Sequence, residues 1–347
     1  MDFVAIHFPA DFERIIESLR ERSWIVTPFD VEEGELYNPA EYVYNEKVEG
    51  INYKLIVDRN LFSFILAAAK KNNPKKIYRE AIALIVFCQL ADILIEPNMA
   101  VYEKIDYDRN NADEAVDELK LFYRIDNTRS EDLIAYILGT SKKVSPINLK
   151  NINSQEIKSK LLEHEWLAEW KSLYMIVLNL VCISEQKINN KDKMESFISW
   201  MVQDFRLSLV SIVYAIFLFS SLRMKKMIKF KRTDCPQLRH KQLTNMTWDL
   251  FFVNNFFRKW IGKKETEEYL LATDDKMVQE LLKKSIYVQK QQDIASLSQC
   301  LHQNEISLLK QVLFKINNTA DRVYKSEKWS LKYRDELIIE KEKLLLN

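Results

Sequence analysis

The chain has 347 residues, and its composition excludes several classes of protein before any motif is considered. It carries 51 basic and 50 acidic residues, so the net charge is +1 and any basic surface must be local. Hydrophobic residues make up 47% of the chain, which is enough for a sizeable core. The four glycines are scattered, which argues against the glycine-rich phosphate loops of P-loop and dinucleotide-binding folds.

The four cysteines and the four histidines are also dispersed. No two cysteines have the spacing of a zinc knuckle, there is no HExxH motif, and no secretion signal opens the chain. We therefore expect reduced thiols, structural histidines and a cytoplasmic location. The uncharged run Leu207 to Leu222 has 16 residues, fewer than the roughly 20 of a membrane-spanning helix. We interpret it as a buried helix and expect no membrane partner.

The first hundred residues combine short apolar segments with helical patterns. An N-terminal elaboration, residues 1–50, contains a helical stretch at 9–22 and a short extended piece at 24–27. The next predicted elements, in chain order, are a strand at 53–57, helices at 61–71 and 75–90, and a strand at 92–96. Pro97 ends that strand, and Asn98 is in position to cap the helix that carries Glu103.

The middle of the chain has no further convincing strand and is predicted to be an all-helical insertion, residues 106–242. Its expected helices cover residues 113–122, 130–138, 154–187, 193–203 and 207–229. The mixed pattern then returns with a helix at 247–260, a strand at 269–272 and a helix at 275–285. Residues 288–347 are predicted to form a charged helical extension. The predicted fold class is therefore α/β, with a core formed by residues 51–105 and 243–287.

Two of the predicted strands, far apart in the sequence, each stop at a carboxylate. The first strand is followed by Asp58, and the last by Thr273-Asp274-Asp275. Because ligands gather at the carboxyl ends of strands in an open parallel sheet, Asp58 and Asp275 are expected to face one spot. Carboxylates gathered without matching cations suit a hard divalent ion such as Mg²⁺ or Mn²⁺.

The order of these acids resembles that of the PIN-domain nucleases. Asp58-Arg59-Asn60 is similar to the opening D-x-N signature of the family, and Asn98 to Glu103 to its second acidic element. Trp248-Asp249-Leu250 is similar to the third element, and Thr273-Asp274-Asp275 to the closing T-x-D element. The resemblance covers residues 53–104 and 244–286. The long helical insertion between the second and third acids is a departure from small PIN domains.

The resemblance implies a three-layer PIN-like fold with a central, mostly parallel sheet, and the activity of a metal-dependent endonuclease. It implies a catalytic, metal-binding set of four carboxylates: Asp58, Glu103, Asp249 and Asp275. Bound Mg²⁺ or Mn²⁺ can activate a water and stabilise the charges of phosphodiester hydrolysis. Three neighbours are expected to orient the acids: Asn60, Thr273 and Asp274. The implied substrate is single-stranded RNA, in RNA turnover or in toxin and defence systems, with single-stranded or flapped DNA as the alternative.

Each assignment has a structural alternative. Asp58 could serve only as the cap of the helix that begins at Leu61, and Glu103 and Asp249 could be surface helix acids. Glu96 competes with Glu103 for the second acidic position. Asp274 competes with Asp275, and either could cap the following helix, although the T-x-D spacing favours Asp275. Asn60 and Thr273 could equally be structural.

A basic segment lies between the insertion and the third acid. It contains six cations within ten residues, namely Arg223, Lys225, Lys226, Lys229, Lys231 and Arg232. We predict that this segment holds the phosphate backbone of a nucleic acid, with a solvated helix end as the alternative. For the whole chain, the other hypotheses are an inactive PIN-like binding or regulatory module and a small-molecule phosphohydrolase. The helical regions could then serve a protein partner or a homo-oligomer.

Overall fold

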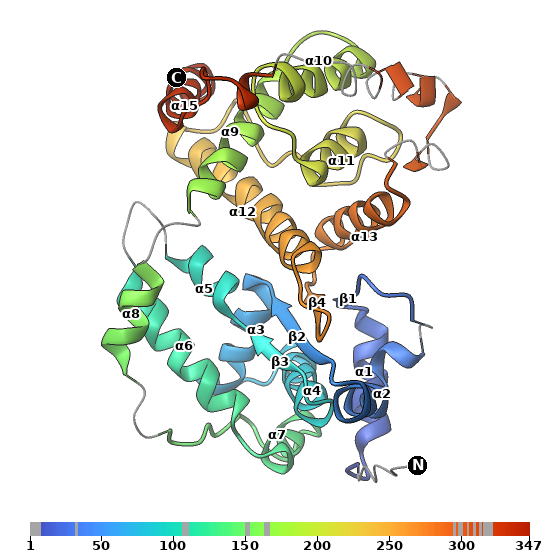
Figure 1. Ribbon diagram of the computed structural model, residues 1–347. Coiled ribbons are helices and arrows are strands. Elements are labelled where there is room, and N and C mark those ends of the chain that lie inside the picture. Colours follow the sequence, from blue (N-terminus) through green and yellow to red (C-terminus); the bar gives the residue numbers. More distant parts are fainter. Residues whose placement is uncertain are drawn as a thin grey trace. The chain divides into compact units, whose positions relative to one another are not determined.

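The computed structural model describes residues 8–31, 34–105, 111–149, 153–162, 167–293, 296–297, 301–303, 305–307, 310–311, 314 and 322–347. The chain divides into two compact units (Figure 1). The first unit consists of Met1–His164 and Arg258–Asp275, and the second of Glu165–Phe257 and Lys276–Asn347. The helical insertion expected at residues 106–242 is therefore shared between the two units.

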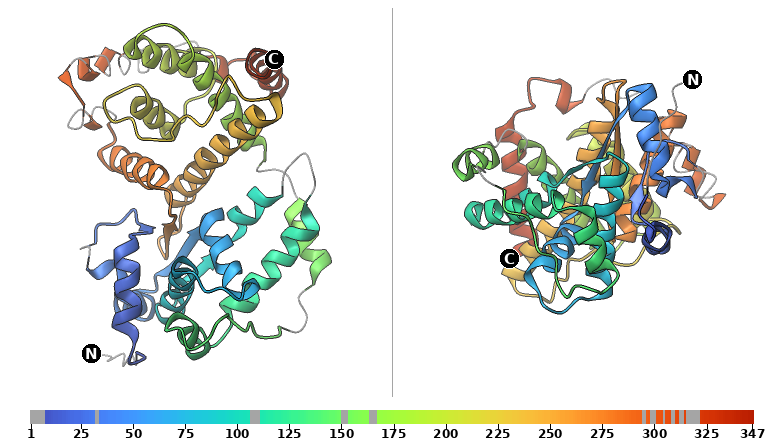
Figure 2. Two further views of the ribbon diagram at one scale, coloured as in Figure 1. Left: turned by 180° about the vertical axis from the view of Figure 1, so that it is seen from behind. Right: turned by 90° about the horizontal axis from the view of Figure 1, so that it is seen from below.

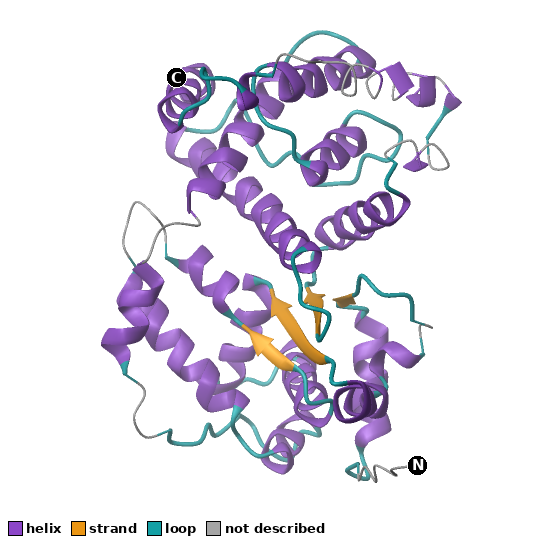
Figure 3. Cartoon of the chain, in the orientation of Figure 1, coloured by secondary structure: helices purple, strands orange, loops and turns teal. Residues whose placement is uncertain are grey.

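The first unit is built on a four-stranded sheet with the order β1-β4-β2-β3 (Figure 3). The strands are β1 (Ile25–Val26), β2 (Asn52–Val57), β3 (Leu94–Glu96) and β4 (Glu267–Ala272). β3 and β4 both run parallel to β2, and β1 pairs antiparallel with β4. The structure thus confirms the predicted α/β class, and the strands expected at 53–57, 92–96 and 269–272 are present.

Helices surround this sheet, and Figure 2 shows the same unit from two further directions. They are α1 (Phe12–Arg22), α2 (Pro39–Tyr44), α3 (Arg59–Lys70), α4 (Lys76–Leu90), α5 (Asn98–Lys104), α6 (Ala112–Asp126), α7 (Ser130–Ile137) and α8 (Ser154–Leu162). The predicted capping role of Asn98 is wrong. Pro97 occupies the N-cap position of α5 with a backbone that is already helical, so the helix begins one residue earlier than the sequence suggested.

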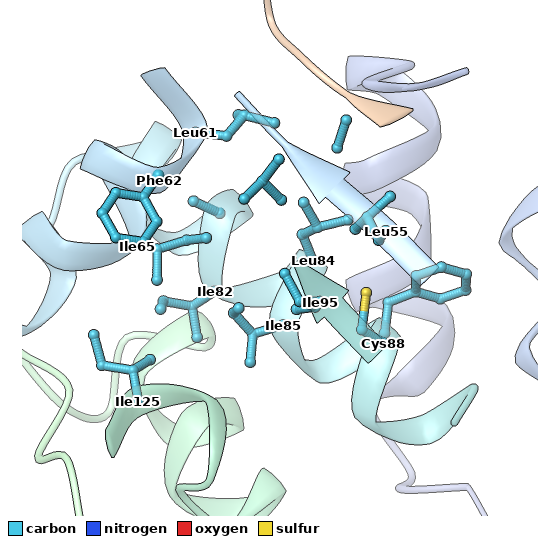
Figure 4. Packing of buried hydrophobic residues seen from close by; sticks show 14 of the residues in the cluster. Leu55, Leu61, Phe62, Ile65, Ile82, Leu84, Ile85, Cys88, Ile95 and Ile125 are labelled. Atoms are coloured by element: carbon cyan, nitrogen blue, oxygen red, sulfur yellow. The ribbon is translucent and has the colours of Figure 1, made fainter. Parts of the chain in front are cut away.

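The core of the first unit lies against one face of the sheet (Figure 4). Side chains alternate along β2, so that Leu55 and Val57 enter the core and are fully buried, whereas Lys54 lies on the opposite face. Leu61 and Phe62 of α3 pack into the same core. Burial of one such aliphatic side chain stabilises the fold by about 1.5–3 kcal/mol, and this packing fixes the direction in which β2 enters α3.

The described elements of the second unit are helical. They are α9 (Leu167–Ser184), α10 (Asn190–Gln203), α11 (Leu209–Leu218), α13 (Lys276–Gln291), the 3₁₀ turn η4 (Val323–Lys325) and α15 (Leu331–Leu346). A long helix, α12 (Pro236–Ile261), begins in this unit and ends in the first. α9 packs against α10 and α15, and α11 packs against α10 and α13.

The helix predicted at 207–229 is wrong beyond Leu218, where α11 ends. The serines that follow satisfy backbone groups in other ways. The Ser220 hydroxyl accepts the Leu222 N–H at 3.1 Å, and the Ser221 N–H donates to a Glu305 carboxylate oxygen at 2.9 Å. Such local side-chain bonds compete with the helical ladder, so the chain continues as a loop up to residue 235.

The apolar run that raised a membrane alternative forms α11, whose residues from Val210 onward are buried. Of the helices described, none combines the length and apolar character needed to cross a bilayer. The predicted reduced thiols can be compared at three positions: Cys88, Cys182 and Cys235 are free, and Cys300 lies outside the described residues.

Candidate functional site

The register of the two central strands places Asp58 beside Thr273. Val57 pairs with Ala272, and the Asp58 N–H donates to the Ala272 carbonyl at 3.1 Å. Asp58 and Thr273 are the next residues on parallel strands, so their side chains project from the same face. The Thr273 hydroxyl donates a hydrogen bond to Oδ2 of Asp58. The sheet therefore joins two residues that were predicted to belong to one site.

The Asp58 carboxylate is buried, with 8% of the residue exposed. Its Oδ1 accepts the Leu61 N–H at 2.7 Å, so Asp58 does cap α3. Burial raises its pKa to about 6, and the nearby Asp275 and Asp274 add to the rise, whereas the bonds from Thr273 and Leu61 oppose it. The cap uses only part of the acceptor capacity of the Asp58 carboxylate, because an ionised carboxylate has about four acceptor positions.

Thr273 connects Asp58 to the third residue of the T-x-D element. Its side chain is fully buried, and its hydroxyl oxygen accepts the Asp275 N–H at 3.0 Å while its proton is donated to Asp58. One hydroxyl therefore fixes both the Asp58 carboxylate and the backbone from which Asp275 projects. The orienting role of Thr273 toward a metal stays a prediction, and Asp275 itself is half-buried.

Asp274 has a different partner, which the sequence analysis missed. The Trp24 indole Nε1 donates to its carboxylate at 2.8 Å, and the Trp24 carbonyl accepts the Thr273 N–H at 3.1 Å. Trp24 is 1% exposed. It thus holds the Thr273-Asp274 turn from two sides. The only signal in the sequence was the short extended segment at 24–27, and nothing there indicated a partner 250 residues away.

Next to Trp24 lies a partly buried ion pair. The Arg22 guanidinium is 5.7 Å from the centre of the Trp24 ring and 2.7 Å from a carboxylate oxygen of Glu80. Glu80 belongs to α4 and is 3% exposed. The hydrogen bond to Glu80 raises the pKa of Arg22, and the charge of Asp274 raises it further. The N-terminal segment is therefore tied to the same sheet edge as the candidate site.

The second acidic position is carried by α5, which packs against α3 and β2. Glu103 is half-buried on this helix. Its competitor Glu96, at the end of β3, is ion-paired with Lys259, whose ammonium lies 5.6 Å from the centre of the Tyr269 ring. Which of Glu96 and Glu103 is the second acid stays a prediction. The third orienting residue predicted, Asn60, is exposed on the first turn of α3.

Asp249, the predicted third acid, belongs to the second unit, whereas the other three acids belong to the first. It lies on α12, half-buried, and its carboxylate is ion-paired with Lys229. One cation of the basic segment, Lys229, is therefore ion-paired with a predicted metal ligand. The convergence of Asp249 with the other acids stays a prediction.

The basic segment is a loop rather than a helix end. Five of its cations are exposed: Arg223, Lys225, Lys226, Lys231 and Arg232. Of these, Arg232 donates to the carbonyls of Leu344 and Leu345, at 2.6 and 3.1 Å. Together with Arg239, which donates to Leu345 at 2.6 Å, it satisfies the last carbonyls of α15. The free basic surface is therefore smaller than the sequence indicated.

The comparisons with family models, curated proteins and solved structures found no match to this chain. In the described part of the chain, no group of three or more His, Cys, Asp or Glu side chains is arranged to hold a metal ion. The donor chemistry at the sheet edge nevertheless suits Mg²⁺, which typically takes one or two protein carboxylates and completes its shell with water and substrate phosphate. Asp58 and Asp275 offer two carboxylates, and Thr273 holds the carboxylate of Asp58 and the backbone N–H of Asp275.

Proposed function

We propose that the chain is a metal-dependent endonuclease with a PIN-like core, and that single-stranded RNA is its substrate. The observation that carries the proposal is the Asp58–Thr273–Asp275 connection at the carboxyl ends of β2 and β4. Asp58 is buried there with two neutral hydrogen-bond donors, and burial raises its pKa to about 6. A buried carboxylate with a second acid beside it is the arrangement that a divalent cation stabilises.

In this proposal Asp58 is the central metal ligand and Asp275 the second. Glu103 and Asp249 are the further acids, acting directly or through water. Bound Mg²⁺ or Mn²⁺ would supply an activated water and neutralise charge on the phosphate. The chain's own contribution is placement, because Thr273 fixes the carboxylate of Asp58 and the backbone of Asp275, and Leu61 fixes the other oxygen of Asp58.

The exposed cations of the 219–235 loop support a polyanionic substrate. Arg223, Lys225, Lys226 and Lys231 are all at the surface. Neutralising phosphates in this way releases counterions, so substrate affinity should fall as salt rises. Lys229 contributes differently, since it pairs with Asp249 and would be displaced, or would bridge to phosphate, if Asp249 served as a ligand.

The direct test is cleavage of a labelled single-stranded RNA by the wild-type chain and by Asp58→Asn, each in Mg²⁺, in Mn²⁺ and in EDTA. Asparagine can still cap α3, so the fold should persist while the ligand charge is lost. A matched control is Asp126→Asn, because Asp126 also has a pKa raised to about 6 by burial but lies at the end of α6. We expect Asp58→Asn to be inactive and Asp126→Asn to be active. Full activity of Asp58→Asn in either metal would refute the assignment.

Two other functions give different outcomes in the same assay. A catalytically inactive binding or regulatory module would show no cleavage and no thermal shift with Mn²⁺. A small-molecule phosphohydrolase would hydrolyse nucleotides while leaving RNA intact. A single-stranded or flapped DNA substrate, tested in parallel, identifies the nucleic acid that is cut.

A further inference from the structure

A row of aromatic rings runs from the interior of the second unit to its surface. Trp200 of α10 stacks on Phe205 with ring centres 4.9 Å apart, and Phe205 meets Trp329 at 5.2 Å. Trp329 in turn contacts Tyr324 at 4.8 Å and Tyr333 at 6.2 Å. Phe205 is fully buried, whereas Tyr324 is 44% exposed. The row therefore begins in the core and ends in solvent.

The exposed end of this row is held in place. Around Tyr324 the backbone forms successive turns, in which the Ser326 N–H donates to the Val323 carbonyl at 3.0 Å and the Trp329 N–H to Ser326 at 3.2 Å. The Arg206 guanidinium lies 5.4 Å from the centre of the Tyr324 ring and is itself fixed by Glu169 at 2.9 Å. A ring that is ordered in advance loses little conformational entropy when a ligand stacks on it.

The segment that carries Tyr324 and Trp329 is rich in cations, whereas the carboxylates of Asp204 and Glu340 lie near Tyr333 and Glu336 lies 3.8 Å from Lys332. Residues 322–333 contain four cations and one carboxylate, namely Arg322, Lys325, Lys328 and Lys332 against Glu327. The three lysines are exposed. An exposed ring, that of Tyr324, beside a half-buried Trp329 and among cations matches the two parts of a single-stranded nucleic acid, because bases stack on rings and phosphates pair with the cations. An acidic peptide would use the lysines but would leave the aromatic faces without a matching group.

We propose that Tyr324, Trp329 and the lysines at 325, 328 and 332, here named the aromatic platform, bind single-stranded nucleic acid by base stacking. The inference rests on the proposed function for its substrate, since it gives the same chain a second contact with the strand that it cleaves. α15 connects the platform to the basic loop. Tyr333 lies at its first turn, and Arg232 of the loop holds the Leu345 carbonyl at its other end. At 1.5 Å per residue the two ends are about 18 Å apart.

The test is fluorescence anisotropy of a labelled oligouridylate bound to the complete chain in EDTA, where metal-dependent cleavage does not occur. Removing one stacking ring typically weakens single-strand binding by roughly 5- to 150-fold, so Tyr324→Ala should raise Kd by a factor in that range. Tyr324→Phe keeps the ring and should bind as the wild type does. Tyr44→Ala is the matched control, because Tyr44 lies on α2 in the first unit and is 48% exposed. It should leave Kd unchanged.

Lys328→Gln provides a second arm that does not depend on the ring. It should weaken binding and reduce the dependence of Kd on salt, since one phosphate contact is lost. Equal Kd values for wild type, Tyr324→Ala and Lys328→Gln would overturn the platform, as would a wild-type chain that binds no oligouridylate. Binding of a polyglutamate peptide in place of RNA would also overturn it in favour of a protein partner. Platform-dependent binding without cleavage in Mn²⁺ would refute the endonuclease while leaving the platform in place.

Discussion

The hydroxyl of Thr273 donates a hydrogen bond to the carboxylate of Asp58, although the two residues are 215 positions apart in the sequence. The contact follows from the parallel register of β2 and β4, which pairs Val57 with Ala272 and leaves the next residue of each strand side by side. The same hydroxyl accepts the Asp275 N–H. Both strand-end acids thus depend on one buried side chain, and several measurements can probe that dependence.

Asp58→Asn should make the fold less sensitive to rising pH. The ordinary pKa of the group is 3.8 and burial raises it to about 6, so the folded state holds the proton more tightly than the unfolded state. The resulting stability is present below about pH 4 and is lost as pH rises through about 6. Wild type should therefore lose roughly 2–3 kcal/mol of its free energy of unfolding, relative to Asp58→Asn, between about pH 4 and pH 8.

Urea denaturation at a series of pH values measures this shift. Asp126→Asn should show a similar trend, because burial also raises the pKa of Asp126 to about 6. That result would show that the method detects such carboxyls. A variant of Asp58 that loses stability relative to wild type as the pH rises would contradict the raised pKa.

Thr273→Val should damage the site while keeping the shape of the side chain. It removes the partner of Oδ2 of Asp58, at a cost of about 1–3 kcal/mol for this buried group, and the partner of the partly buried N–H of Asp275. The bond from Thr273 holds the pKa of Asp58 down, so its loss should move the acid limb of the pH–rate profile to higher pH. Thr273→Ser retains the hydroxyl and should restore the wild-type profile. If the valine and serine variants have the same pH–rate profile, the hydrogen bonds of the Thr273 hydroxyl are not part of the site.

The two neighbouring acids Asp274 and Asp275 should respond differently to the same substitution. Trp24 holds the Asp274 carboxylate at 2.8 Å, and asparagine at this position keeps an oxygen acceptor for the indole. Asp274→Asn should therefore keep most of its activity, whereas Asp275→Asn should lose it with its ligand charge. Rates of RNA cleavage in Mn²⁺ compare the two, and the reverse order would transfer the ligand role to Asp274.

Trp24→Phe tests the contribution of the N-terminal strand. The substitution retains a buried ring but removes the indole N–H that Asp274 accepts. Because Asp274 is partly exposed, we expect a loss of about 1 kcal/mol in the free energy of unfolding. Denaturation of Trp24→Phe, Asp274→Ala and the double variant would show whether the loss comes from this hydrogen bond. If both substitutions remove the same bond, their losses in the free energy of unfolding should not add in the double variant. Additive losses would mean that the bond carries little of the stability.

The sequence alone was sufficient for the elements on which Asp58 and Asp275 lie. A short apolar run followed by an acid and then by a helical pattern identified both strand ends, because burial in the sheet interior demands such runs. Register could not be read from either run alone, so the Thr273 hydrogen bond to Asp58 was not foreseen in atomic detail. Trp24 was missed because its role depends on a strand pairing, that of β1 with β4, which leaves no local pattern.

The errors have local physical causes. Residues 219–229 have a helical composition, but the Ser220 hydroxyl accepts the Leu222 N–H and the distant Glu305 accepts the Ser221 N–H. The predicted cap Asn98 was displaced because Pro97 already adopts the helical conformation. Among the six predicted phosphate-binding cations, Arg232 and Lys229 have partners within the second unit, contacts that depend on tertiary packing.

The most direct test of the central claim is calorimetric titration of Mn²⁺ into the wild-type chain, Asp58→Asn and Asp275→Asn. The account predicts saturable binding to wild type and a Kd raised at least tenfold in both variants, because each loses one of the two proposed ligand carboxylates at the residues that Thr273 connects. Asp126→Asn should bind as the wild type does. Equal affinity in all four proteins, or no binding heat with the wild type, would contradict a metal site at this edge of the sheet.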